Sequence, residues 1–212
     1  MRSISIVAVG LALLATPAMA APADAYGDEW YRSEFWSGEY PNGFTVLKDT
    51  TVKLRPTLDP KAAATIDCAL PAKATYQAWN NDRVANDGLQ FVSFTEVDEM
   101  EVTKDYETTL YQHIDATQVP VTFKKGTKWT YLTYFGEGAF LMEYDGVEYD
   151  GDQDLLEVSK STTEGERDYD EWMRIDCSNQ MWGWLFMDEL VKDEVTFTSP
   201  NIVTYGEAAD AE

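Results

Sequence analysis

The chain has 212 residues, of which 44% are hydrophobic, and its 38 acidic residues outnumber its 16 basic residues to give a net charge of −22. This charge excludes nucleic acid as a partner, because nucleic-acid binding depends on Lys and Arg side chains that neutralise phosphates. It also disfavours anionic lipid, whereas it favours cations such as calcium, polyamines or basic proteins.

The first twenty residues, MRSISIVAVGLALLATPAMA, have the pattern of a secretory signal peptide. Arg2 precedes the apolar run Ile4 to Ala15, and Ala18-Met19-Ala20 has the small residues after which a signal peptidase cleaves. The run is shorter than the roughly 20 residues that a membrane-spanning helix needs, and no later stretch is apolar enough. We therefore expect a periplasmic or secreted protein without a membrane span. Removal of residues 1–20 would take away Arg2 and leave 15 basic and 38 acidic residues, a net charge of −23.

Alternating hydrophobic residues and turn signals predict many short β-strands from residue 44 onward. Strands are expected within 44–54, 89–97, 100–114 and 128–135. Tight turns are expected at Lys124-Lys125-Gly126 and at Asp145-Gly146, the strongest hairpin signal of the chain. The polar residues 159–170 predict a mobile loop, and short helical pieces are expected only at 60–65 or 187–192. This spacing of strands predicts an all-β sandwich or small barrels.

The stretch EWMRIDCSNQMWGWLFMDELV, residues 171–191, holds three tryptophans and predicts two strands joined by a Ser-Asn turn. Side chains alternate along a strand, so Trp182 and Trp184 share one face and Leu185 takes the other. We therefore expect at least one tryptophan of this stretch at the surface.

The two cysteines, Cys68 and Cys177, both follow Ile-Asp. An even number of cysteines in an oxidising compartment predicts a disulfide. The bridge would close a loop of about 110 residues, worth roughly 4 to 5 kcal/mol in the chain-entropy model, and would tie the two halves of the chain together. A metal or redox pair is the weaker alternative, since the chain has no CxxC motif and a single histidine, His113.

Several segments resemble the bacterial SH3-like (SH3b) family. TLYQHI (109–114) is similar to its opening Leu-Tyr strand, FKKGTKWTYL (123–132) to its basic-basic-Gly turn and following strand, EWMRIDC (171–177) to its central Trp strand, and WGWLFMDELV (182–191) to its closing Gly-Trp segment. In the first half, FTVLKDTTVKLRPTLDP (44–60) resembles the family's opening and CALPAKATYQAW (68–79) its next turn and strand, although a closing segment is missing there.

The resemblance implies an all-β fold of two small SH3-like barrels in tandem, joined by the disulfide. The expected division is a signal peptide (1–20), an aromatic segment (21–43), a degenerate SH3-like domain (44–103), an SH3-like domain (104–192) with an inserted hairpin (136–170), and final strands with an acidic, disordered tail (193–212).

The same resemblance implies a peptide groove lined by aromatic rings. The first-strand tyrosine and the Trp strand border such grooves, which makes Tyr111 and Trp172 candidates. The full set of candidate ligand-binding residues is Tyr111, Trp129, Tyr131, Tyr134, Trp172 and Trp184. Against this, buried aromatic rings are the more usual case, and any single member can be core.

Acidic residues at short spacing form a second candidate site, because calcium prefers oxygen ligands. The candidate metal ligands are Asp145, Glu148, Asp150, Asp152 and Asp154. The EF-hand pattern fails, since Leu155 and Ser161 stand where it needs glycine and glutamate, so an exposed hairpin tip is the alternative. His113 is read as structural rather than as a general base, since no nucleophile motif accompanies it.

The sequence thus predicts a non-enzymatic binding module of the bacterial cell envelope, with no cofactor required. Its ligand class would be a peptide, such as the stem peptide of peptidoglycan, held on an aromatic surface. The alternatives are a calcium-dependent structural or adhesion protein, a module whose partner is another protein without any small ligand, and a hydrolase that works through paired carboxylates.

Overall fold

The structure, a computed structural model, describes residues 25–34, 42–78, 90–190, 197–198, 201–204 and 207–209, so the predicted signal peptide lies outside the described residues. The described chain is mostly β, and all its strand pairs are antiparallel, which confirms the predicted class. No helix among these residues is long and apolar enough to cross a bilayer.

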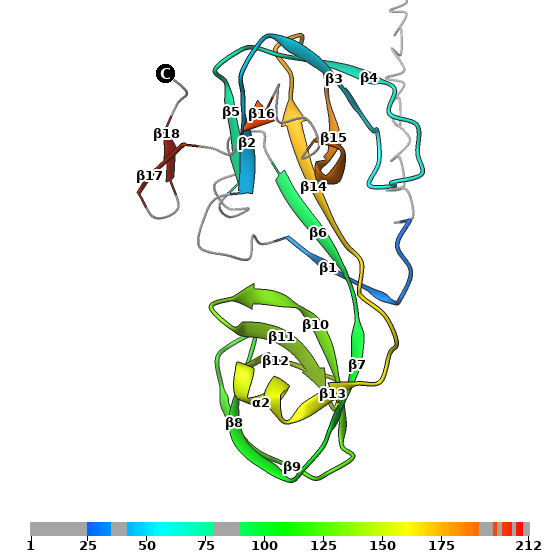
Figure 1. Ribbon diagram of the computed structural model, residues 1–212, viewed down its shortest axis with the longest axis vertical. Helices are drawn as coiled ribbons and strands as arrows, with labels where there is room; N and C mark the ends of the chain where they lie inside the picture. The colour runs from blue at the N-terminus through cyan, green and yellow to red at the C-terminus, as the bar shows by residue number, and fades with distance from the viewer. Residues whose placement is uncertain are drawn as a thin grey trace, which may run out of the picture.

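The strands form two units, and one is inserted into the other (Figure 1). The inserted unit, residues 98–161, is a seven-stranded sheet in the order β13-β7-β10-β11-β12-β8-β9. Its strands are β7 (Asp98–Val102), β8 (Tyr106–Gln112), β9 (Gln118–Phe123), β10 (Lys128–Gly136), β11 (Ala139–Tyr144), β12 (Val147–Gly151) and β13 (Ser159–Ser161). The one-turn helix α2 (Gln153–Glu157) lies between β12 and β13. Its core is one hydrophobic cluster that includes Trp129, Phe140 and Met142.

The outer unit holds the strands on either side of this insertion. Its main sheet has the order β1-β6-β14-β15, formed by β1 (Trp30–Ser33), β6 (Gln90–Glu96), β14 (Tyr169–Asp176) and β15 (Trp182–Phe186). Two smaller sheets are β3 (Thr50–Leu54) with β4 (Ile66–Leu70), and β2 (Asn42–Val46) with β5 (Thr75–Ala78) and β16 (Phe197–Thr198). Helix α3 (Met187–Leu190) follows β15, and β17 (Asn201–Thr204) pairs with β18 (Glu207–Ala209).

The disulfide between Cys68 and Cys177 is present, with its two Cα atoms 5.2 Å apart, but it lies within the outer unit. Both cysteines belong to the same hydrophobic cluster, together with Phe44, Leu54 and Ile175. The sequence led us to expect a bridge between two tandem units. The bridge instead lies inside one unit. Moreover, strand pairing among the described residues closes neither of the large sheets into a barrel.

The segments 171–177 and 182–191 explain this difference. They were expected to complete a domain that begins at residue 104, but β14 pairs with β6, and Arg55 forms a two-way backbone bridge with Trp184. The strand Trp182–Phe186, which follows the inserted unit in sequence, therefore belongs to the outer unit. The expected hairpin insertion at 136–170 instead holds β11 and β12, which are part of the inserted sheet.

Local turns follow the sequence closely. Asp145 and Gly146 have φ angles of 53° and 74°, which a two-residue hairpin of the favoured type requires, and they join β11 to β12. The turn at Lys124-Lys125-Gly126 is confirmed, with Gly126 at a φ of 88°. Helix α3 confirms the expected helical piece near 187, whereas residues 60–65 form no helix.

Two segments that polarity predicted to be irregular hold some strand residues. In the polar stretch 159–170, residues 162–168 form no strand or helix, whereas Ser159–Ser161 form β13 and Tyr169 begins β14, and these residues pair through their backbones. In the tail that we expected to be disordered, Glu207–Ala209 pair with β17.

The two units are joined along a nearly continuous strand. β6 and β7 are separated only by Val97 and run from the outer unit into the inserted unit (Figure 1). A side-chain hydrogen bond of 2.9 Å between Thr95 and Thr133 connects β6 to β10. Both threonines are buried, so this contact lies inside the junction rather than on its rim.

A buried charge pair closes the junction where the chain returns. The carboxylate of Asp98 is almost fully buried, forms an ion pair with Arg167 and accepts a 2.9 Å hydrogen bond from the hydroxyl of Ser161. The backbone of Asp168 accepts a hydrogen bond from the N–H of Glu96 at 3.0 Å. The entry and exit of the inserted unit are therefore held side by side.

Candidate functional site

Two of the six predicted ligand-binding aromatics are core residues. Trp129 packs in the cluster of the inserted unit, and its indole N–H donates a 3.1 Å hydrogen bond to Ser159. Trp172 is fully buried in the outer unit, and its indole N–H donates to the hydroxyl of Tyr26 at 2.8 Å. A ligand does not reach either ring in this structure, since their own neighbours cover them.

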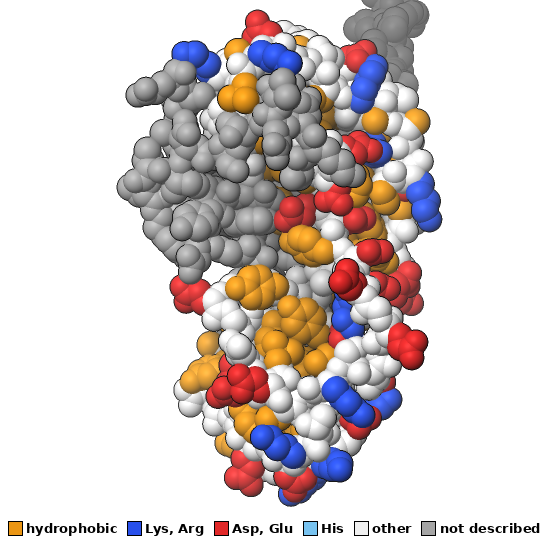
Figure 2. All heavy atoms as spheres, viewed as in Figure 1, with side chains coloured by type: hydrophobic (Ala, Val, Ile, Leu, Met, Phe, Trp, Pro, Cys, Tyr) orange, Lys and Arg blue, Asp and Glu red, His pale blue; other side chains and the backbone are white. Residues whose placement is uncertain are grey.

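The other four aromatics lie in different places. Tyr131 is partly buried and stacks on Phe140, with ring centroids 5.2 Å apart, and Trp184 is partly buried in the outer unit. Tyr111 and Tyr134 are exposed, at 43% and 45%. Tyr134 follows Tyr131 on β10, and Figure 2 shows hydrophobic side chains gathered over β10 and β11. The structure therefore does not gather the six residues into one groove.

Tyr111 belongs to a separate face of the inserted unit, on β8 and β12. Tyr111 and Asp150 are direct cross-strand partners, which places their side chains next to one another on the same side of the sheet. His113 is two residues further along β8 and its Nδ1 lies 2.7 Å from Oδ1 of Asp150. Glu148, two residues before Asp150 on β12, shares this side by strand alternation.

Tyr31 of β1 extends this face toward the outer unit. Burial, and then the negative charge of Glu148, raises the pKa of Tyr31 to about 12. The phenol therefore stays neutral at physiological pH and lies beside a carboxylate. We call Tyr31, Tyr111, His113, Glu148 and Asp150 the acidic tyrosine face. It offers exposed ring surface and negative charge together, which suits the ammonium or guanidinium group of a basic peptide.

The five predicted calcium ligands do not form a cluster. Among the described residues, no group of three or more acidic, histidine or cysteine side chains is placed to hold a metal ion. Asp145 lies in the turn, Asp150 contacts His113, and Asp152 caps α2 by accepting a 3.1 Å hydrogen bond from the backbone N–H of Leu155. Asp154 follows in the first turn of α2, where a negative charge favours the helix dipole.

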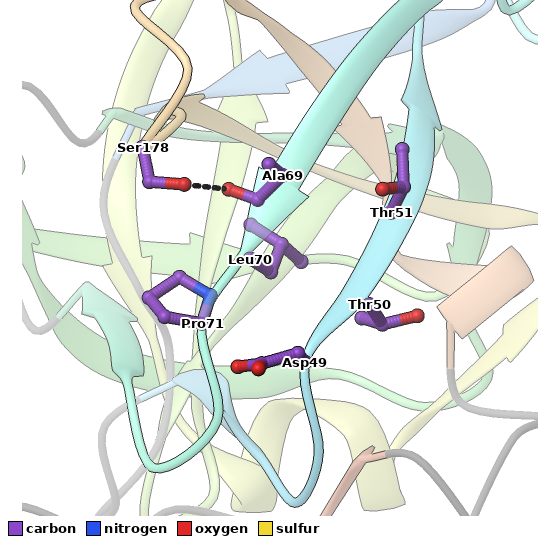
Figure 3. A pocket seen from close by; sticks show the side chains of 7 residues that line it. All are labelled: Asp49, Thr50, Thr51, Ala69, Leu70, Pro71 and Ser178. Atoms are coloured by element: carbon purple, nitrogen blue, oxygen red, sulfur yellow. Dashed lines mark hydrogen bonds between the residues drawn. The ribbon is translucent and has the colours of Figure 1, made fainter.

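A shallow depression of about 600 Å³ lies at the end of the β3–β4 ribbon (Figure 3). Its lining includes Asp49, Thr50 and Ser178. The hydroxyl of Ser178 donates to the carbonyl of Ala69 at 2.9 Å, and Asp49 accepts from the backbone N–H of Ala72 at 2.8 Å. These polar groups already serve the fold, which leaves the acidic tyrosine face as the better candidate site.

Sequence reasoning missed three aromatic residues that are exposed or only partly buried, namely Trp182, Tyr26 and Tyr31. Trp182, at 52% exposure, is the exposed tryptophan that the stretch 171–191 predicted, but it was not among the candidates, and the guanidinium of Arg174 lies 4.5 Å from its ring centre. Tyr26 and Tyr31 lie in the aromatic, acidic segment 26–43. The density of rings there was the available signal, although it did not reveal which surfaces they contact.

A scan of the chain against protein-family models finds no matching family, and searches of the curated proteins and of the solved structures find no significant match.

Proposed function

We propose that this chain is a non-enzymatic binding module of the cell envelope, located outside the cytoplasm, which holds a peptide on the acidic tyrosine face. The observation that carries the proposal is the exposed ring of Tyr111 beside the carboxylate of its cross-strand partner Asp150. A peptide with a basic side chain would stack its aliphatic stem on the ring and place its charge near Glu148 and Asp150. The stem peptide of peptidoglycan is the ligand class that the SH3-like resemblance implies.

We also propose that the outer unit is SH3-like. The support is that its opening segment 44–60 and the closing segment 182–191 meet through the bridge between Arg55 and Trp184. The guanidinium of Arg55 donates to both carboxylate oxygens of Glu189 in α3, at 2.7 and 2.8 Å, so the Leu-Arg-Pro motif contacts the end of the closing segment directly. The inserted unit would be a second SH3-like unit, since its sheet curves around a hydrophobic cluster of its own (Figure 1).

The proposed location rests on two features. The disulfide is of the kind that persists in oxidising compartments, and the expected signal peptide would direct export. The excess of acidic residues would keep such a protein soluble and would attract basic ligands from a distance.

The test is isothermal titration calorimetry. The protein is titrated with soluble peptidoglycan fragments and, in a separate experiment, with an extended lysine-containing peptide. Tyr111→Ala and Glu148→Gln should each weaken binding about two- to fivefold, the range of an exposed cation–ring or charge contact. Higher salt should weaken it further, because the charges are exposed.

Tyr169→Ala is the matched control, since Tyr169 is also an exposed tyrosine but lies in the outer unit. This control should bind as the wild type does. Binding of neither probe, or equal binding by the wild type and both face variants, would contradict the proposal. Binding of the lysine peptide alone would keep the face but replace the peptidoglycan ligand with a basic segment of a protein.

A further inference from the structure

The four-stranded sheet carries a second aromatic cluster on the face that bears Phe94 and Trp172. Val92, Phe94 and Trp172 form its buried floor on β6 and β14. The partly buried side chains packed against this floor are Tyr26, Trp30, Leu58, Trp184 and Phe186. Of these, Tyr26 is the one that comes from the irregular segment ahead of the first strand.

The phenol of Tyr26 is bound as a ligand would be. Its ring stacks on Phe94 with centroids 3.7 Å apart and planes at 9°, and it meets the edge of Trp30 at 5.1 Å. Its hydroxyl donates to Oδ2 of Asp170 at 2.7 Å and accepts from the indole N–H of Trp172 at 2.8 Å. A flat ring surface, one acceptor and one donor together match a phenol in shape and in hydrogen bonding.

Arg55 also contacts this cluster. Its guanidinium lies 5.9 Å from the ring centre of Trp172 and 5.7 Å from that of Phe186, and it is fixed by Glu189 and by the carbonyl of Ala62. The indole that donates to the phenol is therefore positioned independently of Tyr26. The ring of Trp172 thus has contacts with Arg55 and Phe186 that do not involve Tyr26.

The segment that carries Tyr26 is weakly attached by its backbone. Within the described residues, the backbone hydrogen bonds of 25–29 are one local turn, from Trp30 N–H to the carbonyl of Gly27, and one contact from Val97 N–H to the carbonyl of Glu29. The side chains on either side of Tyr26, from Ala25 to Asp28, are exposed. The phenol is thus the main anchor of an otherwise exposed segment.

We propose that this cluster is a binding site for the tyrosyl side chain of an extended peptide, and that Tyr26 occupies it as an exchangeable plug supplied by the chain itself. A tethered plug competes at an effective concentration of the order of millimolar, so it masks the site from weak ligands. An external peptide gains access in proportion to the fraction of molecules whose plug is released. The site then responds to a tyrosine-bearing partner segment and not to single basic side chains.

Burial raises the pKa of Tyr26 well above its ordinary value, and the hydrogen bond with Asp170 acts in the same direction. Burial also raises the pKa of Asp170. The phenol therefore remains a donor at any physiological pH. A phosphorylated tyrosine would bring a second negative charge to Asp170, which opposes its binding, whereas the positive charge of Arg55 acts in the other direction.

The test uses the peptide PADAYGD, residues 22–28, labelled with fluorescein, and its PADAAGD counterpart, in fluorescence polarisation with three proteins. Tyr26→Ala should bind the tyrosine peptide at least tenfold more tightly than the wild type, and at least tenfold more tightly than it binds the alanine peptide. Tyr26→Phe keeps the ring but loses both hydrogen bonds, so its affinity for the tyrosine peptide should lie between the other two.

Equal affinity of the wild type, Tyr26→Phe and Tyr26→Ala for the tyrosine peptide would overturn the proposal, as would equal affinity of Tyr26→Ala for both peptides. If Tyr26→Ala does not fold, Tyr26→Phe decides the question. Tighter binding than the wild type then supports the plug, and unchanged binding overturns it. These outcomes are independent of the acidic tyrosine face, because no residue of that face is altered.

Discussion

The outer unit and the inserted unit are both antiparallel, but they are held together differently. The inserted unit is one contiguous stretch, and three of its neighbouring strand pairs are hairpins between consecutive strands. The outer unit is assembled from stretches on both sides of the insertion, and a disulfide across 109 residues holds them. Contacts between residues close in sequence cost little loop-closure entropy, whereas contacts between distant residues cost more. A disulfide offsets part of that cost, because it restricts the unfolded chain. The disulfide is therefore placed in the unit that needs it.

The largest effect is expected when this bridge is removed. The double substitution Cys68→Ser with Cys177→Ser should destabilise the outer unit by about 2–5 kcal/mol, while the inserted unit keeps its structure. Amide hydrogen exchange measures the two units separately. Exchange should rise in β4, β14 and β15 and stay slow in β10, β11 and β12. Equal loss of protection in both sets would show that the units fold as one.

A smaller effect is expected at the junction. Asp98→Asn keeps the size of the side chain but leaves Arg167 without its negative partner, which should cost about 1.5–3 kcal/mol, the range for a hydrogen bond to a charged group. It should also separate thermal unfolding into two transitions, which calorimetry would resolve. Glu99→Gln removes the exposed ion pair with Lys128 at the neighbouring position and should leave a single transition. Identical melting of both variants would mean that the Asp98 pair does not couple the units.

The smallest effect is a change in the titration of Tyr31, which belongs to the outer unit but faces Glu148 of the inserted unit. With a pKa of about 12 in the folded protein against 10.0 for an unperturbed tyrosine, Tyr31 favours folding fully below pH 10. This contribution is lost as the pH rises from 10 to about 12, because the unfolded chain releases the proton first. Absorbance at 295 nm follows the titration, and Tyr31→Phe identifies the signal.

Glu148→Gln should lower the pKa of Tyr31 only slightly, since burial is the larger cause and the carboxylate the smaller one. A fall to the ordinary value would show that the carboxylate, and not burial, controls Tyr31. If the pKa of Tyr31 did not change at all, Glu148 would not interact with Tyr31. Tyr31 would then not belong to the acidic tyrosine face.

Much of the local structure could be predicted from the sequence, because turns and strand alternation are local. The Asp145-Gly146 hairpin, the β class and the Cys68–Cys177 bridge were all predicted and are confirmed. Helix α2 was missed, since five residues are too few to show a helical period. The nesting of the two units was also missed, because nothing local in β14 tells that its partner is β6, more than seventy residues earlier.

The candidate site was only partly accessible to the same reasoning. Alternation along the strand correctly placed one tryptophan of 171–191 at the surface, but it could not tell that Trp172 lies under Tyr26 and Arg55. Burial of a ring depends on which distant segments cover it. For this reason the exposed candidates were Tyr111 and Tyr134, and the tryptophans at 129 and 172 were core.

The position of the inserted unit between the two cysteines has a consequence for biosynthesis. Cys68 leaves the ribosome long before Cys177, and the whole of residues 98–161 is made in the interval. The inserted unit has time to fold while the thiol of Cys68 is still free, since chains fold by units as they emerge. Formation of the disulfide, which must wait for Cys177, can therefore follow the folding of the inserted unit.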